Sequence, residues 1–153
     1  TVSKSALPAR YRFDHSFSTA IYYLLAGADF SSFHRIASDE IWHFYDGSTL
    51  MVHLINANRG YSSHLLGVHV QEGDVPQLVI PRDTWMAAEM VDKTTYGLIG
   101  CTVAPGFDFA DFEMADPAKL IQQFPEREAL IRRLTRSERE MPDMIADMDQ
   151  ESS

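Results

Sequence analysis

Apolar and polar side chains alternate in short segments through the middle of the chain, from Phe17 to Val103. These segments are rich in β-branched and aromatic residues and are separated by turn residues, a pattern typical of an antiparallel β sandwich or barrel. About eight strands are predicted, at residues 17–26, 33–37, 41–45, 49–56, 61–70, 77–80, 85–91 and 95–103. Turns are expected at residues 27–29, 46–47, 56–60, 73–74 and 92–93.

The pattern changes to a helical one after Asp116. Asp116 can cap a helix that begins at Pro117. The apolar residues of this helix fall on one stripe: Leu120, Ile121 and Phe124. A second helix is predicted from Pro125. Its apolar residues are expected to face inward: Leu130, Ile131 and Leu134.

These patterns divide the chain into an N-terminal arm (residues 1–16), a β barrel (17–116), C-terminal helices packed on the barrel (117–136) and an acidic tail (137–153). Small polar and acidic residues dominate the tail, so we expect it to be disordered. A length of 153 residues suits one domain that buries a substantial core without disulfides or metal ions.

Composition narrows the class of partner. With 22 acidic and 13 basic residues, the formal net charge is -9, which disfavours nucleic acids and anionic membranes. No apolar run reaches the roughly 18 residues of a membrane-spanning helix, and no signal peptide is visible, so we expect a cytoplasmic protein. The single Cys101 cannot form an internal disulfide. Segment 50–55 is apolar on both faces, and a covered outer face indicates a homodimer.

Chemistry-bearing side chains are densest between Ser32 and Gly47. We interpret this stretch as one hairpin, with a break at Ser38-Asp39 and a tight turn at Asp46-Gly47. Side chains alternate across a strand, so one face is expected to carry Glu40, Trp42 and Phe44, and the other Ile41, His43 and Tyr45. The density of imidazole, carboxylate and aromatic groups indicates a pocket for a small molecule.

The order of His34, Glu40 and Gly47 resembles the first motif of the cupin superfamily, in which two histidines, a glutamate and a glycine line a small β-barrel. More specifically, segments 18–25, 34–47 and 100–109 are similar to the small single-domain family often called cupin-5. The resemblance covers residues 17–125 and implies an all-β, RmlC-like fold: a cupin-type antiparallel β-barrel or jelly-roll sandwich with short C-terminal helices. Germins and sugar-nucleotide 3,5-epimerases share this fold, and the cupin-5 family has no agreed reaction.

The chain departs from the cupin pattern at two metal-ligand positions. Ile36 stands where the second histidine is expected, and Met86 ends the segment that replaces the second motif, Pro81 to Met86. An alkyl group provides no ligand, and a thioether is a poor one for iron(II) or manganese(II). We therefore predict no cofactor and no conventional dioxygenase or oxalate chemistry. An atypical metal site stays open as an alternative, with ligands from His34, Glu40 and either His69 or His53.

A third departure concerns the N-terminal side. Relatives usually carry a further segment with a His-Pro-Glu-Gly-Gly-like strand ahead of the first matching strand, and the sequence from Thr1 does not show it. If that segment normally closes the pocket, we expect the residues that it contributes to be missing here.

His34 and Glu40 are the candidate catalytic residues, because the matching cupin positions face the barrel interior. A neutral imidazole can act as a general base near pH 7, and burial should raise the pKa of Glu40. The structural alternatives are a buried His34–Glu40 pair, or a Glu40 carboxylate bonded to the backbone or to Arg35. The candidate ligand-binding residues are Tyr23, Trp42, His69, Trp85 and Met86. Tyr22 and Tyr23 face opposite ways, and the sequence leaves open which of them enters the barrel.

Two functions fit these residues. The first is a metal-independent isomerase, epimerase or lyase acting on a small polar, carbohydrate-like metabolite. His34 would abstract a proton next to a carbonyl, and Glu40 or a barrel tyrosine would return or orient one. The second is a non-catalytic module in which the same barrel holds a small ligand, since aromatic walls with few convergent polar groups describe both kinds of site.

Overall fold

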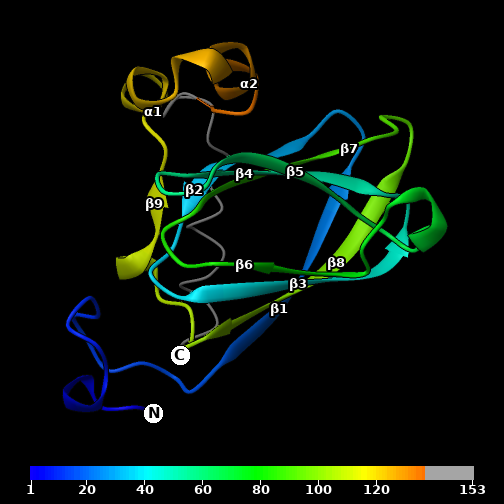
Figure 1. Ribbon diagram of the computed structural model, residues 1–153. Coiled ribbons are helices and arrows are strands. Elements are labelled where there is room, and N and C mark those ends of the chain that lie inside the picture. The colour runs from blue at the N-terminus through cyan, green and yellow to red at the C-terminus, as the bar shows by residue number, and fades with distance from the viewer. Residues whose placement is uncertain (137–153) are drawn as a thin grey trace.

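Two antiparallel β-sheets packed face to face make up the middle of the chain (Figure 1). The computed structural model describes residues 1–136, so the predicted disordered tail at 137–153 lies outside the described residues. One sheet has four strands, in the order β1 (Thr19–Ala26), β8 (Tyr96–Ala104), β3 (Asp39–Gly47) and β6 (Gln77–Ile80). The other has five, in the order β5 (Gly60–Leu66), β4 (Leu50–Asn56), β7 (Trp85–Met90), β2 (Phe30–Arg35) and β9 (Glu113–Met114). This is the antiparallel jelly roll that the strand pattern and the family resemblance predicted.

The stretch from Ser32 to Gly47 is not one hairpin, and this prediction was wrong. β2 belongs to the five-stranded sheet and β3 to the four-stranded sheet, so the chain crosses between sheets after β2. Gly47 has a φ of 93°, as a tight turn requires, but the turn leads into β4 in the other sheet. Turn chemistry predicts where the chain reverses, whereas the pairing partner of each strand depends on residues far away in sequence.

The predicted strands are present with shifted ends, and the largest difference is at the predicted strand 61–70. β5 ends at Leu66, and a short 3-10 helix, η2 (Val70–Glu72), follows it. The Asp74 carboxylate folds this loop back by accepting hydrogen bonds from the His69 backbone N–H at 3.0 Å and from the Thr49 hydroxyl at 2.8 Å. His69 therefore lies in an exposed loop. The two-residue β9 had no signal in the sequence pattern.

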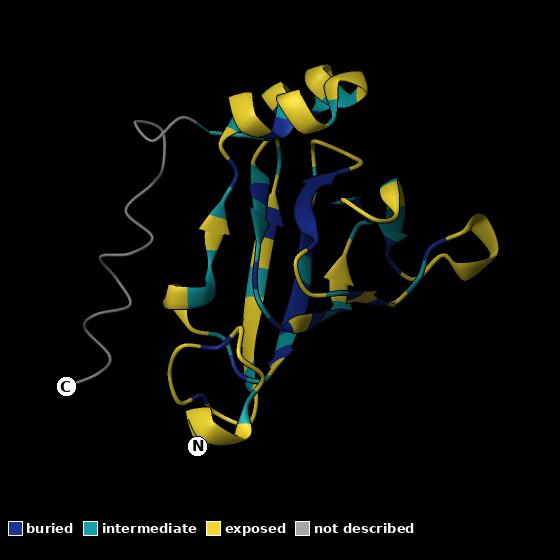
Figure 2. Ribbon diagram, turned by 60° about the vertical axis from the view of Figure 1, so that its left-hand side comes forward, coloured by how far each residue is buried: buried dark blue, intermediate teal, exposed yellow. Residues whose placement is uncertain are grey.

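The inward faces of the two sheets enclose the main hydrophobic core, which includes Ile36, Trp42, Met86 and Cys101. Figure 2 shows buried segments concentrated in the strands, while the outer surface of the helices is exposed. The predicted alternation in β3 is confirmed, because Glu40 and Trp42 are buried between the sheets and Tyr45 is exposed on the other side.

The C-terminal helices form where they were predicted. Asp116 caps α1 (Pro117–Gln123) by accepting hydrogen bonds from two backbone N–H groups, and the second helical segment starts as a 3-10 turn, η4 (Pro125–Arg127), before α2 (Glu128–Arg133). Both helices lie outside the five-stranded sheet (Figure 1). None of the helices within residues 1–136 has the length and apolar character needed to cross a membrane.

The helices cover the outer face of the five-stranded sheet with a second hydrophobic cluster. It joins strand residues such as Ile55 and Trp85 to Leu120, Ile131 and Leu134 of the helical segment. The outer apolar face of segment 50–55 is therefore covered within the chain, so this segment no longer gives a reason to expect a homodimer. The homodimer itself stays a prediction.

Ionic contacts at Glu89 fasten α2 to the same face. Its carboxylate contacts Arg133 of α2, the Lys93 ammonium at 3.0 Å and the His53 ring at 3.1 Å. Burial acts to raise the pKa of Glu89, but the hydrogen bonds from Arg133, Lys93 and His53 outweigh it and lower the pKa to about 2. Glu89 is thus ionised at neutral pH and acts as the anchor for the helix.

Candidate active site

His34 points into the barrel from β2, opposite Met86 of β7, with which it pairs in register. Its Nδ1 lies 2.7 Å from the Ser32 carbonyl oxygen, and its ring stacks on Phe112 with the centroids 5.3 Å apart. A carbonyl oxygen can only accept a hydrogen bond, so Nδ1 carries the proton and the Nε2 lone pair is left available. In the described residues no hydrogen bond reaches Nε2.

Burial lowers the pKa of His34, and the hydrogen bond to the Ser32 carbonyl offsets only part of that effect. The imidazole is therefore neutral near pH 7, with its basic nitrogen already unprotonated. This is the state that a general base needs before it can remove a proton from carbon.

Glu40 points inward from β3, on the opposite wall of the barrel, and is 8% exposed. Burial raises its pKa, and the nearby Trp42 indole N–H and Cys101 thiol lower it by a smaller amount. Trp42 and Cys101 are register partners on β3 and β8. No group within residues 1–136 makes a hydrogen bond of normal geometry to the buried Trp42 Nε1. This N–H is therefore a donor without a partner beside a protonatable carboxyl group.

The two candidate catalytic residues do not neutralise each other. No hydrogen bond joins His34 to Glu40 in the described part of the chain, and neither group is among the causes that shift the other's pKa. Arg35 does not reach Glu40 either, because its side chain points outward to Glu113, with an Nε–Oε2 distance of 2.7 Å. The alternatives in which Glu40 pairs with His34 or accepts a bond from Arg35 are therefore wrong, and in the described residues no backbone hydrogen bond is among the causes of the Glu40 pKa shift either.

The candidate ligand-binding residues separate into two groups. Tyr23, Trp42 and Met86 face the interior core, which answers which tyrosine enters the barrel. Trp85 instead lies in the outer cluster beneath the helices, with the Arg35 guanidinium 4.4 Å from its ring centroid. His69 lies in the exposed loop before η2. Trp85 and His69 therefore do not join His34 and Glu40 in the interior, because strand parity places Trp85 outward and the Asp74 contacts end the strand before His69.

The interior does not fit the metal site that the fold family implies. Ile36 and Met86 are both in the core, at the positions where the cupin pattern requires histidines. His53 points outward and bonds to Tyr61 and Glu89, so it cannot complete a set with His34 and Glu40. Within the described residues, no group of three or more histidine, cysteine or carboxylate side chains could hold a metal ion. The atypical metal set is thus not assembled.

Two hollows in the described part of the molecule lie away from this interior. One, of about 230 Å³, lies outside the five-stranded sheet between Trp85, Glu113 and Lys119. The other lies along the loop from Val68 to Glu72. Their charged side chains are exposed or paired with one another, so neither hollow is the candidate active site.

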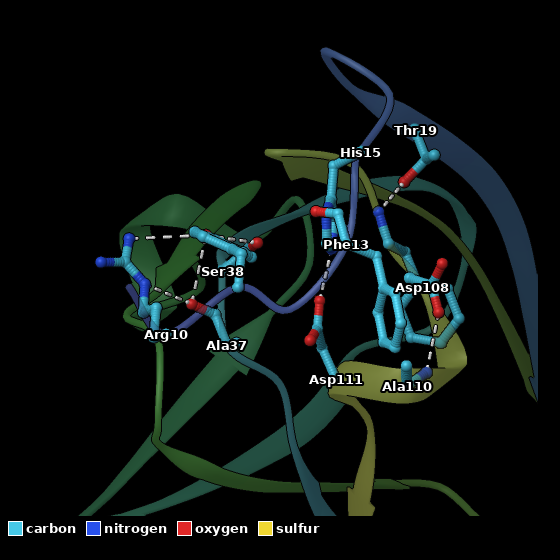
Figure 3. A network of polar contacts seen from close by, with 11 residues as sticks. Arg10, Phe13, His15, Thr19, Ala37, Ser38, Asp108, Ala110 and Asp111 are labelled. Carbon is cyan, nitrogen blue, oxygen red and sulfur yellow. Dashed lines mark hydrogen bonds and ion pairs between the residues drawn. The ribbon is translucent and has the colours of Figure 1, made fainter. Parts of the chain in front are cut away.

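Sequence reasoning missed two residues near the interior site. Phe112 stacks on His34, although no periodicity in the sequence links the two residues. His15, which carried no signal, is 3% exposed and contacts Asp111 next to Phe112 (Figure 3). Only the three-dimensional approach of the N-terminal arm to the β8–β9 connection reveals this contact.

Comparison with known proteins decides the family. A family model described as cupin superfamily (DUF985), Cupin_5, matches residues 1–115. The chain belongs to this cupin family. A crystal structure of a protein from Shewanella oneidensis is 30% identical, with a TM-score of 0.77, and the alignment covers 90% of this chain and 84% of that one. The resemblance seen in the sequence is confirmed.

Other solved structures agree on the cupin fold. A hypothetical protein from Leishmania major is 29% identical, with a TM-score of 0.75, covering 80% of this chain and 78% of that one. A dTDP sugar isomerase from Desulfovibrio desulfuricans is 14% identical, with a TM-score of 0.55 and 65% of each chain covered, which is a likeness of fold alone. No protein with a curated function matches the chain.

Proposed function

We propose that this cupin binds a small polar, carbohydrate-like metabolite in its barrel and acts on it as a metal-independent isomerase, epimerase or lyase. The observation that carries the proposal is the pair of uncompensated groups on opposite walls. His34 is neutral with Nε2 available, and Glu40 is buried beside an indole N–H without a cation. Burial lowers the pKa of His34 and raises that of Glu40, and shifts of this kind suit a general base and a general acid.

The reaction would proceed through an enediol. Nε2 of His34 takes the proton from the carbon next to a substrate carbonyl, so a C–H bond breaks and an N–H bond forms. The Glu40 carboxyl group, whose pKa burial raises, would give its proton to the carbonyl oxygen, with the Trp42 N–H as a further donor. In isomerisation, protonated His34 would give its proton to the former carbonyl carbon, while the hydroxyl group on the original carbon would lose its proton to the Glu40 carboxylate and become the new carbonyl. In epimerisation, the Tyr23 hydroxyl would instead protonate the original carbon from its opposite face, the enediol hydroxyl would return its proton to Glu40, and the proton on His34 would pass through solvent to the tyrosinate. In a β-elimination, the Glu40 proton would go to the leaving group instead.

The charges near the site favour an uncharged substrate. Burial, the Ser32 carbonyl, Trp42 and Cys101 account for the pKa shifts of His34 and Glu40, and no lysine or arginine within the described residues contributes to them. A phosphate group would lack the charge-assisted hydrogen bonds that normally hold it. Free sugars fit better than the nucleotide-linked sugars named for the Desulfovibrio neighbour.

The test is solvent deuterium incorporation. The protein is incubated in D₂O with a panel of unphosphorylated aldoses and ketoses, and ¹H NMR follows the loss of the C–H signal next to the carbonyl. We expect exchange with the unsubstituted protein and its loss in His34→Gln and Glu40→Gln. His43→Gln is the matched control, because His43 lies on the outer face, where its ring contacts Thr102. Full exchange in both site variants would contradict the proposal.

The non-catalytic binding module is the second candidate. It is supported by the apolar residues at two metal-ligand positions, Ile36 and Met86, which record a site without conventional cupin chemistry. Saturable binding of a sugar without any deuterium incorporation would favour this module over the enzyme.

A further inference from the structure

The ring of His15 is held between two hydrogen-bond acceptors (Figure 3). Nε2 lies 2.5 Å from Oδ2 of Asp111, and Nδ1 lies 2.8 Å from the Phe13 carbonyl oxygen. A carbonyl and a carboxylate both accept, so the ring must donate through both nitrogens, and a neutral imidazole has only one N–H. The geometry is that of a buried imidazolium bound to a carboxylate.

This pair joins the N-terminal arm to the connection between β8 and β9. Two further hydrogen bonds lie beside this pair: the Gly106 N–H donates to the carbonyl of Ser16 at the end of the arm, and the Phe107 N–H donates to the hydroxyl of Thr19 at the start of β1, each at 2.8 Å. On its other side, the arm is tied to the β2–β3 connection, where the Tyr11 hydroxyl lies 2.9 Å from the Ser38 hydroxyl. The arm therefore contacts both the β2–β3 connection, which lies between the strands of His34 and Glu40, and the β8–β9 connection.

The connection held by His15 also carries the ring that covers the candidate base. Asp111 ends the 3-10 helix η3 (Phe109–Asp111), and the next residue, Phe112, stacks on His34. Phe112 also makes edge-on contacts with Phe107 and Phe109. Movement of Asp111 would therefore be transmitted to the aromatic ring on His34.

We propose that the His15–Asp111 pair is a clasp that holds Phe112 against His34, which makes His15 and Asp111 positioning residues for the interior site. The relevance of the clasp to catalysis rests on the proposed function. The effect of the His15–Asp111 contact on the position of the Phe112 ring does not.

The clasp should respond to pH. The titratable groups facing His15 are Asp111 and Asp108 of the β8–β9 connection and Tyr11 of the arm, whose ring centroid is 4.9 Å away. Burial lowers the pKa of His15. Asp111, the Phe13 carbonyl and Asp108 raise it by more than burial lowers it, so the net shift is upward. A raised pKa means that the clasp is closed below the usual histidine range and opens as the pH rises through the folded-state value.

The experiment compares His15→Gln and Asp111→Asn with the unsubstituted protein. The control is His64→Gln, because His64 is a partly exposed histidine whose contact is the neighbouring Ser62 hydroxyl. Imidazole ¹H–¹⁵N correlation spectra report the protonation of His15 and the environment of His34, and amide hydrogen exchange reports the opening of residues 107–112. Phe112→Leu removes the ring from His34 and leaves the clasp residues unchanged.

We expect His15 to be doubly protonated at neutral pH in the unsubstituted protein. Both clasp variants should shift the His34 ring signals in the direction seen in Phe112→Leu and speed exchange in 107–112 by roughly tenfold or more. A singly protonated His15, or His34 signals unchanged in Asp111→Asn, would overturn the proposal. None of these readouts involves turnover, so failure of the clasp and failure of the proposed activity are distinguished.

Discussion

His34 and Met86 lie opposite each other on β2 and β7, and both side chains enter the barrel. The residue paired with His34 on the neighbouring strand is thus a methionine, where the second cupin motif would supply a histidine. Together with Ile36 on the same interior wall, this leaves His34 as an isolated base rather than a member of a metal-ligand set.

Metal content tests this isolation. The protein, purified without chelator or added metal, should contain no stoichiometric transition metal by elemental analysis, and His34→Ala should give the same result. Stoichiometric metal that is lost in His34→Ala would redirect the assignment toward oxygen-dependent or hydrolytic chemistry.

A gain of metal binding follows from the same geometry. The double variant Ile36→His, Met86→His should complete three histidines and Glu40, and bind one zinc or manganese ion by calorimetry. Each single variant lacks one ligand and should bind at least about tenfold more weakly. If circular dichroism shows a folded double variant that binds no metal, the four side chains cannot reach one ion across the barrel.

Cys101 should be chemically inert in the folded protein. Burial and the adjacent Glu40 raise the pKa of its thiol, and the reactive form of a cysteine is the thiolate. A maleimide reagent at pH 8 should leave the native chain unlabelled and add one group after denaturation. Rapid labelling of the native protein would contradict the burial of the site around Glu40.

Stability should fall in acid because of Glu89. Its folded-state pKa is about 2, below the unfolded value, so its contribution is present above the usual glutamate range and is lost as the pH falls toward 2. Glu89→Gln should lower the free energy of unfolding by about 2 kcal/mol at neutral pH, since Lys93 and Arg133 are partly solvated. The loss should diminish in acid, and urea unfolding at several pH values measures it.

Asp83 has a φ of 57°, the one positive value found among the non-glycine residues that the structure describes. It lies in the segment where the second cupin motif places a glycine, and its N–H donates to the Ile36 carbonyl at 2.9 Å. Asp83→Gly should change stability by less than about 0.5 kcal/mol, while Asp83→Val should cost about 1–2 kcal/mol. Equal stability of the two variants in urea would contradict the left-handed backbone.

The sequence predicts the strands, the inward parity of β3 and the helix cap at Asp116, because these depend on local periodicity and turn chemistry. It does not predict that β2 and β3 lie in different sheets, since pairing is a long-range property. The same limit explains Trp85 and His69. Trp85 and Met86 are adjacent on β7 and therefore face opposite sides of the sheet. The end of β5 depends on the hydrogen bonds that the Asp74 carboxylate accepts.

The candidate site is predictable in part. His34 and Glu40 follow from the family motif, but their separation on opposite walls depends on the crossing between sheets. The contacts of Phe112 with His34 and of His15 with Asp111 join segments about 80 to 100 residues apart, and no local pattern encodes them.

The proposed chemistry depends on the protonation state of His34, which imidazole ¹H–¹⁵N correlation spectra recorded from about pH 5 to 9 measure at the ring itself. We predict a neutral ring protonated on Nδ1 at pH 7, with its pKa below the usual value of about 6.5. His34→Gln identifies the signals. A ring protonated on Nε2, or an imidazolium at pH 7, would rule out His34 as the base, because Nε2 would then be unable to accept a proton.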